Sequence, residues 1–231
     1  MDIGKAFSFV FEDEKWITKV LIGGLLFLFS WLIIPFLIVI GYMIEIVNKT
    51  ASDSKELLPE WTNIGNKLTK GFVVFIIYFL YGLPIVFLSI IYSIIIGVLN
   101  TSASAPEGQT VIGTIIGLLS LFLMLVIVIY SIALILILPV AIIKYAVSLN
   151  FSEAFNLKEN WKFVRENITN LILVLVLSYV AQIIGSLGFI ALFIGAAFTS
   201  FYALAVIGNL YGQLAKVGLK KPEIVTVDEI A

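Results

Sequence analysis

The chain contains no cysteine and no histidine, and only 13% of its 231 residues are charged. The two missing residue types exclude disulfides, thiolate ligation of haem or iron–sulfur clusters, the usual zinc sites, and a histidine acid or base. A soluble domain carries about 25% charged residues, so this chain has too few for a water-facing surface. A net charge of −1 provides no footprint for nucleic acid, so neither nucleic acid nor a cofactor is expected as a partner.

What the chain has instead is long apolar runs. Four stretches contain no Asp, Glu, Lys or Arg, namely 20–44, 71–106, 108–143 and 167–215. A helix needs about 20 apolar residues to cross the hydrocarbon core. Membrane β-strands would alternate apolar and polar residues, whereas Leu121–Tyr130 is apolar on every face. The predicted fold class is all-α, a polytopic transmembrane helical bundle that forms a single membrane domain over 1–231.

The apolar stretches divide into crossings at points rich in turn-forming residues. The segment 100–110 has the composition of a loop, and glycines at 185 and 188 favour a break in the last stretch. The predicted spans are 71–99, 111–143, 168–186 and 189–215.

Two polar segments are predicted to form amphipathic helices that lie in the membrane interface, namely 2–19 and 151–166, the second within the segment 144–166. Trp16 and Trp161 each precede an apolar run, at the depth that tryptophan prefers. The two segments also resemble each other, since Gly4–Ser8 parallels Ser152–Asn156 in sequence. The similarity indicates either a weak internal repeat, as in transporter folds, or chance likeness between amphipathic helices.

Basic residues are concentrated in some polar segments and missing from others. They occur in 45–70, 144–166 and the tail 216–231, whereas 100–110 has none. Because cytoplasmic loops carry the excess of Lys and Arg, these basic segments and both termini are predicted to face the cytoplasm of a multi-pass plasma-membrane protein. The acidic residues Glu12–Glu14 before the first apolar run do not fit a cleavable signal peptide.

The stretch 20–44 has basic residues on both sides, which leaves two models open. A re-entrant hairpin broken near Ser30–Pro35 keeps both flanks in the cytoplasm, with halves too short to span and packed against protein. One kinked crossing is the alternative. The distribution of lysines favours the hairpin.

A pattern of spaced residues carries a resemblance to a known family. In order along the chain it comprises Trp16, Lys19, Gly23-Gly24, Pro35, Gly41-Tyr42, Leu58-Pro59-Glu60-Trp61, Gly71, Tyr78 and Leu83-Pro84. The pattern is densest over 9–85 and resembles the uncharacterised prokaryotic membrane-protein family known as domain of unknown function 4013. The resemblance implies a polytopic membrane protein of bacterial or archaeal origin. It implies no activity and no site.

The family-motif residues are the candidate interaction residues. Pro59, Glu60 and Trp61 form either a cytoplasmic docking site or a surface anchor, with Trp61 at the headgroups and Pro59 opening a short helix. Gly41 and Tyr42 either line a substrate path or permit close helix packing and interfacial anchoring. Gly71 completes this set of candidate interaction residues.

Few polar residues lie inside the predicted spans. Gln182 and Asn209 are expected to meet across the last hairpin, in a polar cavity or as an interhelical hydrogen bond. Glu45, Lys70 and Lys144 lie at span ends, where long side chains are expected to reach the interface. Because no charge is expected deep in the membrane, a proton-coupled pump is disfavoured.

The functional hypotheses depend on the absence of recognisable catalytic motifs in the sequence. No catalytic motif, metal site or catalytic site residue is recognised, so an enzyme is not expected. The leading hypothesis is a non-catalytic assembly or scaffold component whose partners are the lipid bilayer, a second copy of the chain or other membrane proteins. The alternative is a transporter or channel for a small or lipidic solute. The third is an interfacial lipid-headgroup enzyme that uses Glu60 or the Glu12–Glu14 cluster.

The topology is testable by labelling because the chain has no cysteine. In intact cells, a membrane-impermeant maleimide should modify Ser104→Cys, and it should modify Ser8→Cys only after the membrane is opened. Modification of Ser8→Cys in intact cells would replace the re-entrant hairpin with a single crossing.

Overall fold

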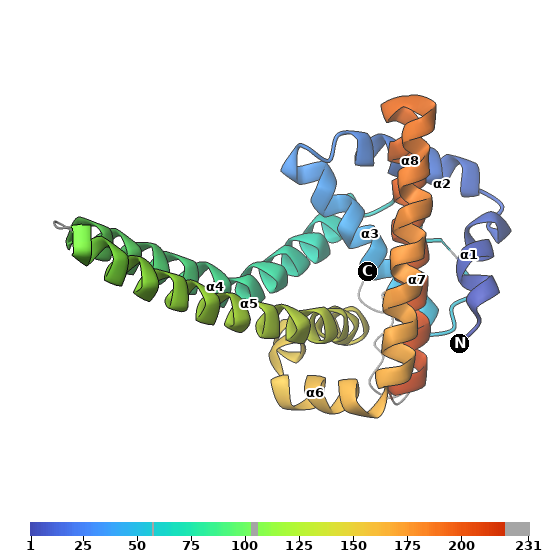
Figure 1. The fold of residues 1–231 in the computed structure, drawn as a ribbon. Helices are drawn as coiled ribbons and strands as arrows, with labels where there is room; N and C mark the ends of the chain where they lie inside the picture. The colour runs from blue at the N-terminus through green and yellow to red at the C-terminus, as the bar shows by residue number, and fades with distance from the viewer. Residues whose placement is uncertain (57, 103–105, 220–231) are drawn as a thin grey trace. The chain divides into compact units, whose positions relative to one another are not determined.

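The structure is a computed structural model in which residues 1–56, 58–102 and 106–219 are described. Within these ranges the chain is helical and contains no strand (Figure 1). The elements are α1 (Ile3–Glu12), α2 (Trp16–Leu28), α3 (Ile33–Ala51), α4 (Ile64–Ser102), α5 (Pro106–Ser148), η1 (Phe151–Phe155), α6 (Leu157–Glu166), α7 (Ile168–Leu187), η2 (Gly188–Ala191) and α8 (Leu192–Gly218).

Four helices among the described residues, α3, α4, α5 and α7, are long and apolar enough to cross a bilayer. The predicted fold class, an all-α polytopic membrane protein, is therefore confirmed. The span predicted over 189–215 corresponds to α8, which is not one of these four, so that crossing stays a prediction.

The chain forms two compact units. Unit 1 combines Met1–Ile77 with Pro139–Ala231, and unit 2 is the segment Tyr78–Leu138. Helices α4 and α5 contribute residues to both units, since each unit boundary falls inside a helix.

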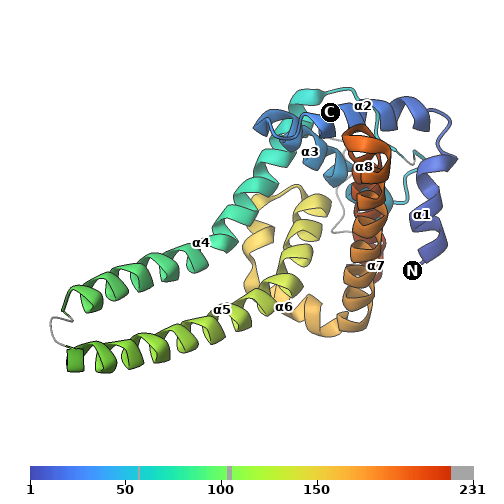
Figure 2. The same ribbon diagram turned by 45° about the horizontal axis from the view of Figure 1, so that its top comes forward.

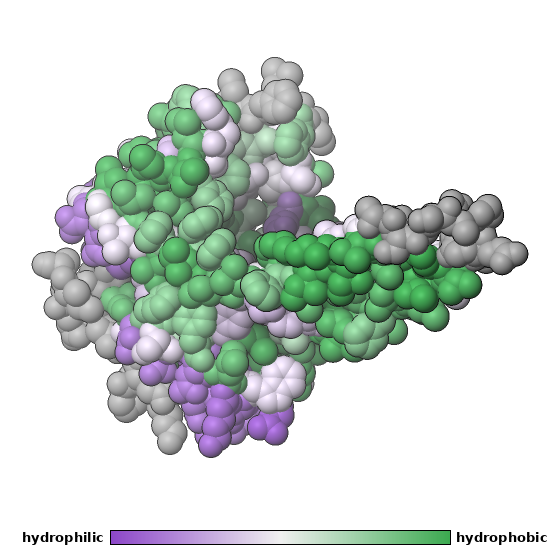
Figure 3. Space-filling view, turned by 90° about the vertical axis from the view of Figure 1, so that its left-hand side faces the viewer, coloured by the Kyte–Doolittle hydropathy of each residue, from purple (hydrophilic) through white to green (hydrophobic). Residues whose placement is uncertain are grey.

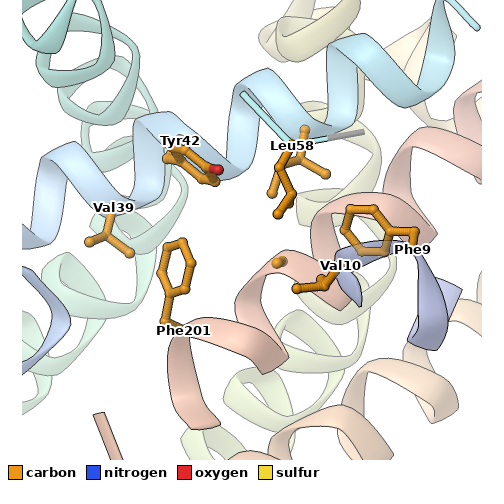
Figure 4. Close-up of a cluster of buried hydrophobic side chains, with 8 residues drawn as sticks. Phe9, Val10, Val39, Tyr42, Leu58 and Phe201 are labelled. Atoms are coloured by element: carbon orange, nitrogen blue, oxygen red, sulfur yellow. The ribbon is translucent and has the colours of Figure 1, made fainter. Parts of the chain in front are cut away.

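Helix α8 is the central element of unit 1, because α1, α2, α3 and α7 all pack on it. Figures 1 and 2 show α7 and α8 side by side along much of their lengths. One core cluster joins α1, α3 and the loop after α3 to α8, and consists of Phe9, Val10, Val39, Tyr42, Ile46, Leu58, Phe201 and Ala205. In this cluster the rings of Tyr42 and Phe201 lie 5.5 Å apart (Figure 4).

Helix α3 and the first turns of α4 cross at backbone contact. A Cβ atom added to Gly41 would lie 1.8 Å from the carbonyl oxygen of Lys67. A Cβ added to Gly71 would lie 1.8 Å from the carbonyl oxygen of Leu37. Only glycine permits two helices to approach this closely, so Gly41 and Gly71 fix the crossing point.

Unit 2 is a hairpin made by the later part of α4 and the earlier part of α5, which run side by side in both views (Figures 1 and 2). The Tyr130 hydroxyl donates a hydrogen bond to the Tyr81 carbonyl at 2.7 Å, and the hydroxyls of Tyr92 and Ser120 share another. Tyr81 is the one buried side chain among those described in 78–138. Figure 3 shows that hydrophobic residues cover the side of this hairpin. The hairpin therefore has almost no core of its own, and its outer surface suits lipid or other apolar helices.

The N-terminal helices differ from the predicted boundaries. The amphipathic segment 2–19 is not one helix, because Asp13 ends α1 and accepts a hydrogen bond from the Lys15 amide before α2 begins. The stretch 20–44 is interrupted at 29–32, close to the break expected near 30–35, and Pro35 lies in the first turn of α3, where proline is tolerated. Helix α3 continues to Ala51, so this half is longer than expected. Re-entry or crossing of 20–44 stays a prediction.

The later segments also differ in detail. The predicted loop 100–110 is mostly helical where it is described, since α4 reaches Ser102 and α5 starts at Pro106. The proposed labelling position Ser104 and the tail after residue 219 lie outside the described residues. The suggested repeat does not extend to local structure, because Gly4–Ser8 is α-helical whereas Ser152–Asn156 is a 3-10 turn and its cap.

The close crossing of α3 and α4 predicts that one added methyl group destabilises the protein at Gly71 but not at Gly65. Gly71→Ala should destabilise the protein by about 1–3 kcal/mol or more, because the methyl would overlap backbone that cannot move independently. The matched control is Gly65→Ala in the same helix, where an added Cβ meets nothing within 4 Å. Thermal unfolding in detergent measures both, and equal midpoints for the two variants would contradict the close crossing.

Candidate functional site

Three charged side chains are buried where α3 crosses α4. Glu45, Lys67 and Lys70 are only 4%, 2% and 4% exposed. The Glu45 carboxylate accepts from both lysines, with Lys67 Nζ 2.8 Å from Oε2 and Lys70 Nζ 2.9 Å from Oε1. One carboxylate thus holds two ammonium groups, which leaves one surplus positive charge inside unit 1.

The glycine crossing creates this buried triad. Glu45 follows Gly41 by one helical turn on α3, and Lys67 and Lys70 flank the same crossing on α4. Lys67 Nζ also donates to the Thr62 carbonyl at 2.9 Å and lies 5.9 Å from the centre of the Tyr42 ring. A carbonyl and an aromatic face both stabilise a cation, so the surplus charge is partly compensated.

The Glu45 and Lys70 side chains do not extend outward from the protein as expected at span ends, and their depth relative to the membrane interface stays a prediction. The two side chains turn inward and pair with each other, because a buried charge is stable when a counter-charge and hydrogen bonds satisfy it. Lys144 is half-buried and lines a cavity together with Glu153 and Glu159.

A second buried ion cluster lies at the corner between α1 and α2. Lys19 is 5% exposed, and its Nζ atom lies 2.9 Å from Asp13 Oδ2, 2.7 Å from the Leu58 carbonyl and 3.2 Å from Glu60 Oε1. Lys15, which is exposed, lies 3.5 Å from Glu60. Asp13, the middle residue of the Glu12–Glu14 cluster, is therefore mostly buried, with 11% of its side chain exposed.

Both carboxyl groups in this cluster are held in the ionised form. Burial alone would raise the pKa of Asp13, but the Lys19 ammonium and the amides of Lys15 and Leu58 outweigh it and lower the pKa below its usual value. The hydrogen bond from Lys19 is the main cause that lowers the pKa of Glu60. A carboxyl group that acts as a general acid needs a raised pKa, so neither Asp13 nor Glu60 is suited to donate a proton near neutral pH.

The loop that carries Pro59, Glu60 and Trp61 is fixed by contacts from three elements. The Tyr42 hydroxyl donates to the Pro59 carbonyl at 2.9 Å, and Trp61 Nε1 donates to the Lys19 carbonyl at 2.9 Å. The rings of Trp61 and Tyr42 stack with centroids 4.2 Å apart. This loop does not open a short helix at Pro59, since α4 begins at Ile64.

The six family-motif residues thus gather around one junction. Gly41 and Gly71 set the helix crossing, and Tyr42, which is fully buried, joins it to the loop at 58–61. Trp61 is half-buried against the Tyr42 ring, and its role as a headgroup anchor stays a prediction. The contacts support the close-packing interpretation for Gly41 and Tyr42 over a substrate path.

Gln182 and Asn209 are not paired. Asn209 donates to Thr50 Oγ1 at 3.3 Å and accepts from Gln213 Nε2 at 2.8 Å, whereas Gln182 is exposed on α7. The predicted pairing is wrong because α8 turns Asn209 toward α3, where Gly208 approaches Ile46. Asn209 instead contributes to a polar cavity at the end of α3.

Cavities in the described part of unit 1 include one of about 440 Å³ that is lined by Lys144, Glu153 and Glu159. Another, of about 350 Å³, is mainly apolar and lies between α2, α7 and α8. A third, of about 290 Å³, is lined by four lysines. Among the described residues, no group of three or more acidic side chains is placed to hold a metal ion.

Sequence reasoning missed Asp13, Lys19 and Lys67 as members of buried clusters. The sequence does contain an indication that Lys19 is special, because this lysine directly precedes a charge-free stretch and belongs to the family pattern. No comparable signal existed for Lys67, whose partner Glu45 lies on a different helix.

The long apolar helices, together with an ion-paired junction, define a polytopic helical membrane protein. The chain belongs to the DUF4013 family of proteins of unknown function, whose model matches residues 25–208. This range contains the motif residues at 41–71 and confirms the predicted resemblance, although the prokaryotic origin stays a prediction. No curated protein and no solved structure matches the chain.

The buried triad predicts a large effect of one neutralising substitution. Glu45→Gln should destabilise unit 1 by about 3–5 kcal/mol, because two buried lysines would lose their counter-charge. The control Glu159→Gln disrupts a pair with Lys162 that is 4.0 Å long and largely exposed, and it should change stability by less than about 1 kcal/mol. Denaturant unfolding in detergent measures both, and similar small effects would show that the triad contributes little.

Proposed function

We propose that this chain is a non-catalytic membrane protein that self-associates through the hairpin of unit 2. The observation that carries the proposal is a line of small side chains on the later part of α4, comprising Gly82, Ser89, Ser93 and Gly97. Spacings of seven and four residues place them on one face of the helix. A Cβ added to Gly82 or Gly97 would meet nothing within 4 Å, and Ser89 and Ser93 are exposed.

Small side chains distinguish a helix contact from a lipid contact. Lipid tails are as apolar as leucine and exert no preference for small residues, whereas close helix packing requires them. The hydroxyls of Ser89 and Ser93 donate to carbonyls one turn earlier in α4, so a neighbouring apolar helix would leave no hydroxyl hydrogen unpaired. The neighbouring positions, such as Phe87 and Ile94, are large and exposed, as lipid-facing positions are.

Helix α5 carries a second unused packing motif. Gly113 and Gly117 have the spacing expected for helix packing, and an added Cβ at either meets nothing within 4 Å. Within the described side chains, the motif therefore does not pack α5 against α4. Both helices of the hairpin thus retain surfaces suited to a neighbouring membrane helix.

A second copy of the chain is the simplest occupant. All copies insert with the same orientation, so each residue of one copy lies at the same depth as its counterpart in another. A two-fold interface is self-complementary and brings the same patch of both subunits together. The small residues of α4 would then meet their own counterparts.

The alternatives have weaker support. A transporter needs a polar route into the membrane, and the cavity between α2, α7 and α8 is mainly apolar. An interfacial enzyme that uses a carboxylic acid needs one with a raised pKa. The carboxyl groups of Asp13 and Glu60 both pair with Lys19, and the pKa of each carboxyl group is lowered, which disfavours this role.

Oxidative cross-linking in membranes tests self-association, since the chain contains no other cysteine. Ser93→Cys, an almost isosteric change on the small-residue face, should form a disulfide-linked dimer. Ile94→Cys lies at nearly the same depth but points about 100° away around the helix, and it should cross-link much less. Equal cross-linking of the two variants, or none from Ser93→Cys, would refute the proposed interface.

A packing variant separates a true interface from random collision. Gly97→Leu places a large side chain on the small-residue face and should reduce the Ser93→Cys dimer in the double variant. Ile94→Leu preserves size at a neighbouring position and should leave the dimer unchanged. If Gly97→Leu has no effect, the cross-link reports chance encounters.

A further inference from the structure

A lysine-lined cavity of about 290 Å³ lies in unit 1, and its lining contains no residue of either buried ion cluster. It is bounded by α1, the C-terminal end of α3, the loop that follows, and α8. Its charged lining residues are Lys5, Lys49, Lys55, Lys216, Asp53 and Glu56. Four lysine side chains and two carboxylates thus line the cavity.

Both carboxylates in the cavity lining already form ion pairs with lysines of the same lining. Lys49 pairs with Glu56, and Lys216 pairs with Asp53. Within the described part of the chain, Lys5 and Lys55 have no ion-pair partner. Their positive charge therefore remains available to an incoming anion.

Helix capping does not account for these lysines. Lysine is common near helix C-termini because it interacts with the last free carbonyls. Here the amides of Ser52 and Ser54 donate to the carbonyls of Asn48 and Lys49 at 2.9 and 3.0 Å, so the end of α3 is capped by backbone. The lysines surround the cavity without being needed to end the helix.

Neutral donors complement the charges. Asn209, which is 6% exposed, donates to Thr50 Oγ1, and the Glu56 amide donates to Ser54 Oγ. Because both hydroxyl oxygens act as acceptors in these bonds, the hydroxyl hydrogens of Thr50 and Ser54 remain available to donate. Thr50, Ser54 and Asn209 all line the cavity.

We propose that this cavity binds a phosphate group. Phosphate offers several acceptor oxygens and up to two negative charges, which matches convergent ammonium and hydroxyl donors better than a single carboxylate does. The exposed side chains of Ile3 and Phe11 on α1 suit an interfacial helix, which would place the cavity at headgroup depth. A phospholipid headgroup is therefore the first source to test, and free phosphate is the second.

The test uses the full chain reconstituted in nanodiscs of phosphatidylcholine, with or without phosphatidic acid. Native mass spectrometry should show phosphatidic acid retained in preference to phosphatidylcholine. In a parallel experiment, inorganic phosphate is titrated into the phosphatidylcholine nanodiscs at constant ionic strength, with thermal unfolding as the readout. Retention of the lipid without a response to inorganic phosphate assigns a headgroup site, and stabilisation by inorganic phosphate assigns a site for free phosphate.

Paired variants show whether the cavity is responsible. Lys5→Gln combined with Lys55→Gln should weaken binding at least about tenfold, which corresponds to about 1.4 kcal/mol. The control, Lys158→Gln combined with Lys162→Gln on α6, removes the same charge from outside the cavity and should bind normally. Equal loss in both variants, or no binding of either probe to the unaltered chain, overturns the proposal. Neither outcome depends on whether the hairpin self-associates.

Discussion

The contact between α3 and α4 at Gly41 and Gly71 determines what the rest of unit 1 can do. Because the two backbones touch there, Glu45 lies within reach of Lys67 and Lys70, and charges otherwise excluded from a helical membrane protein become mutually satisfied. The same crossing places Tyr42 where its hydroxyl and its ring hold the loop at 58–61. Removing either glycine would therefore disturb packing, charge compensation and loop position together.

The second ion cluster extends this junction to the N-terminal helices. Lys19 joins Asp13 at the end of α1 to the carbonyl of Leu58 and the carboxylate of Glu60. A loop without helical structure is thus fixed between three helices by charged and aromatic contacts. The family motif therefore contains charged and aromatic residues of the kind found in functional sites, but within the chain these residues hold the loop in place. Surfaces that remain unused lie elsewhere, on the hairpin and around the lysine-lined cavity.

The sequence predicted those features that depend on local composition. Charge-free stretches identified the helical membrane class, and glycines at 185 and 188 predicted the break at the end of α7. Contacts between distant segments were not predictable in the same way. Nothing near Glu45 in sequence indicates two lysine partners more than twenty residues later, and the direction of Asn209 depends on how α8 packs on α3. The structure brings the candidate interaction residues at 41–71 together at one junction, whereas their role in an interaction stays a prediction.

The shared carboxylate of Glu45 also constrains how the protein is made. Helix α3 leaves the ribosome before Lys67 and Lys70 are available, so for a time the Glu45 carboxylate lacks both of its counter-charges. Stable packing of α3 must then wait for the first turns of α4, which carry both lysines. The order of synthesis is thus coupled to the order of folding by a single side chain.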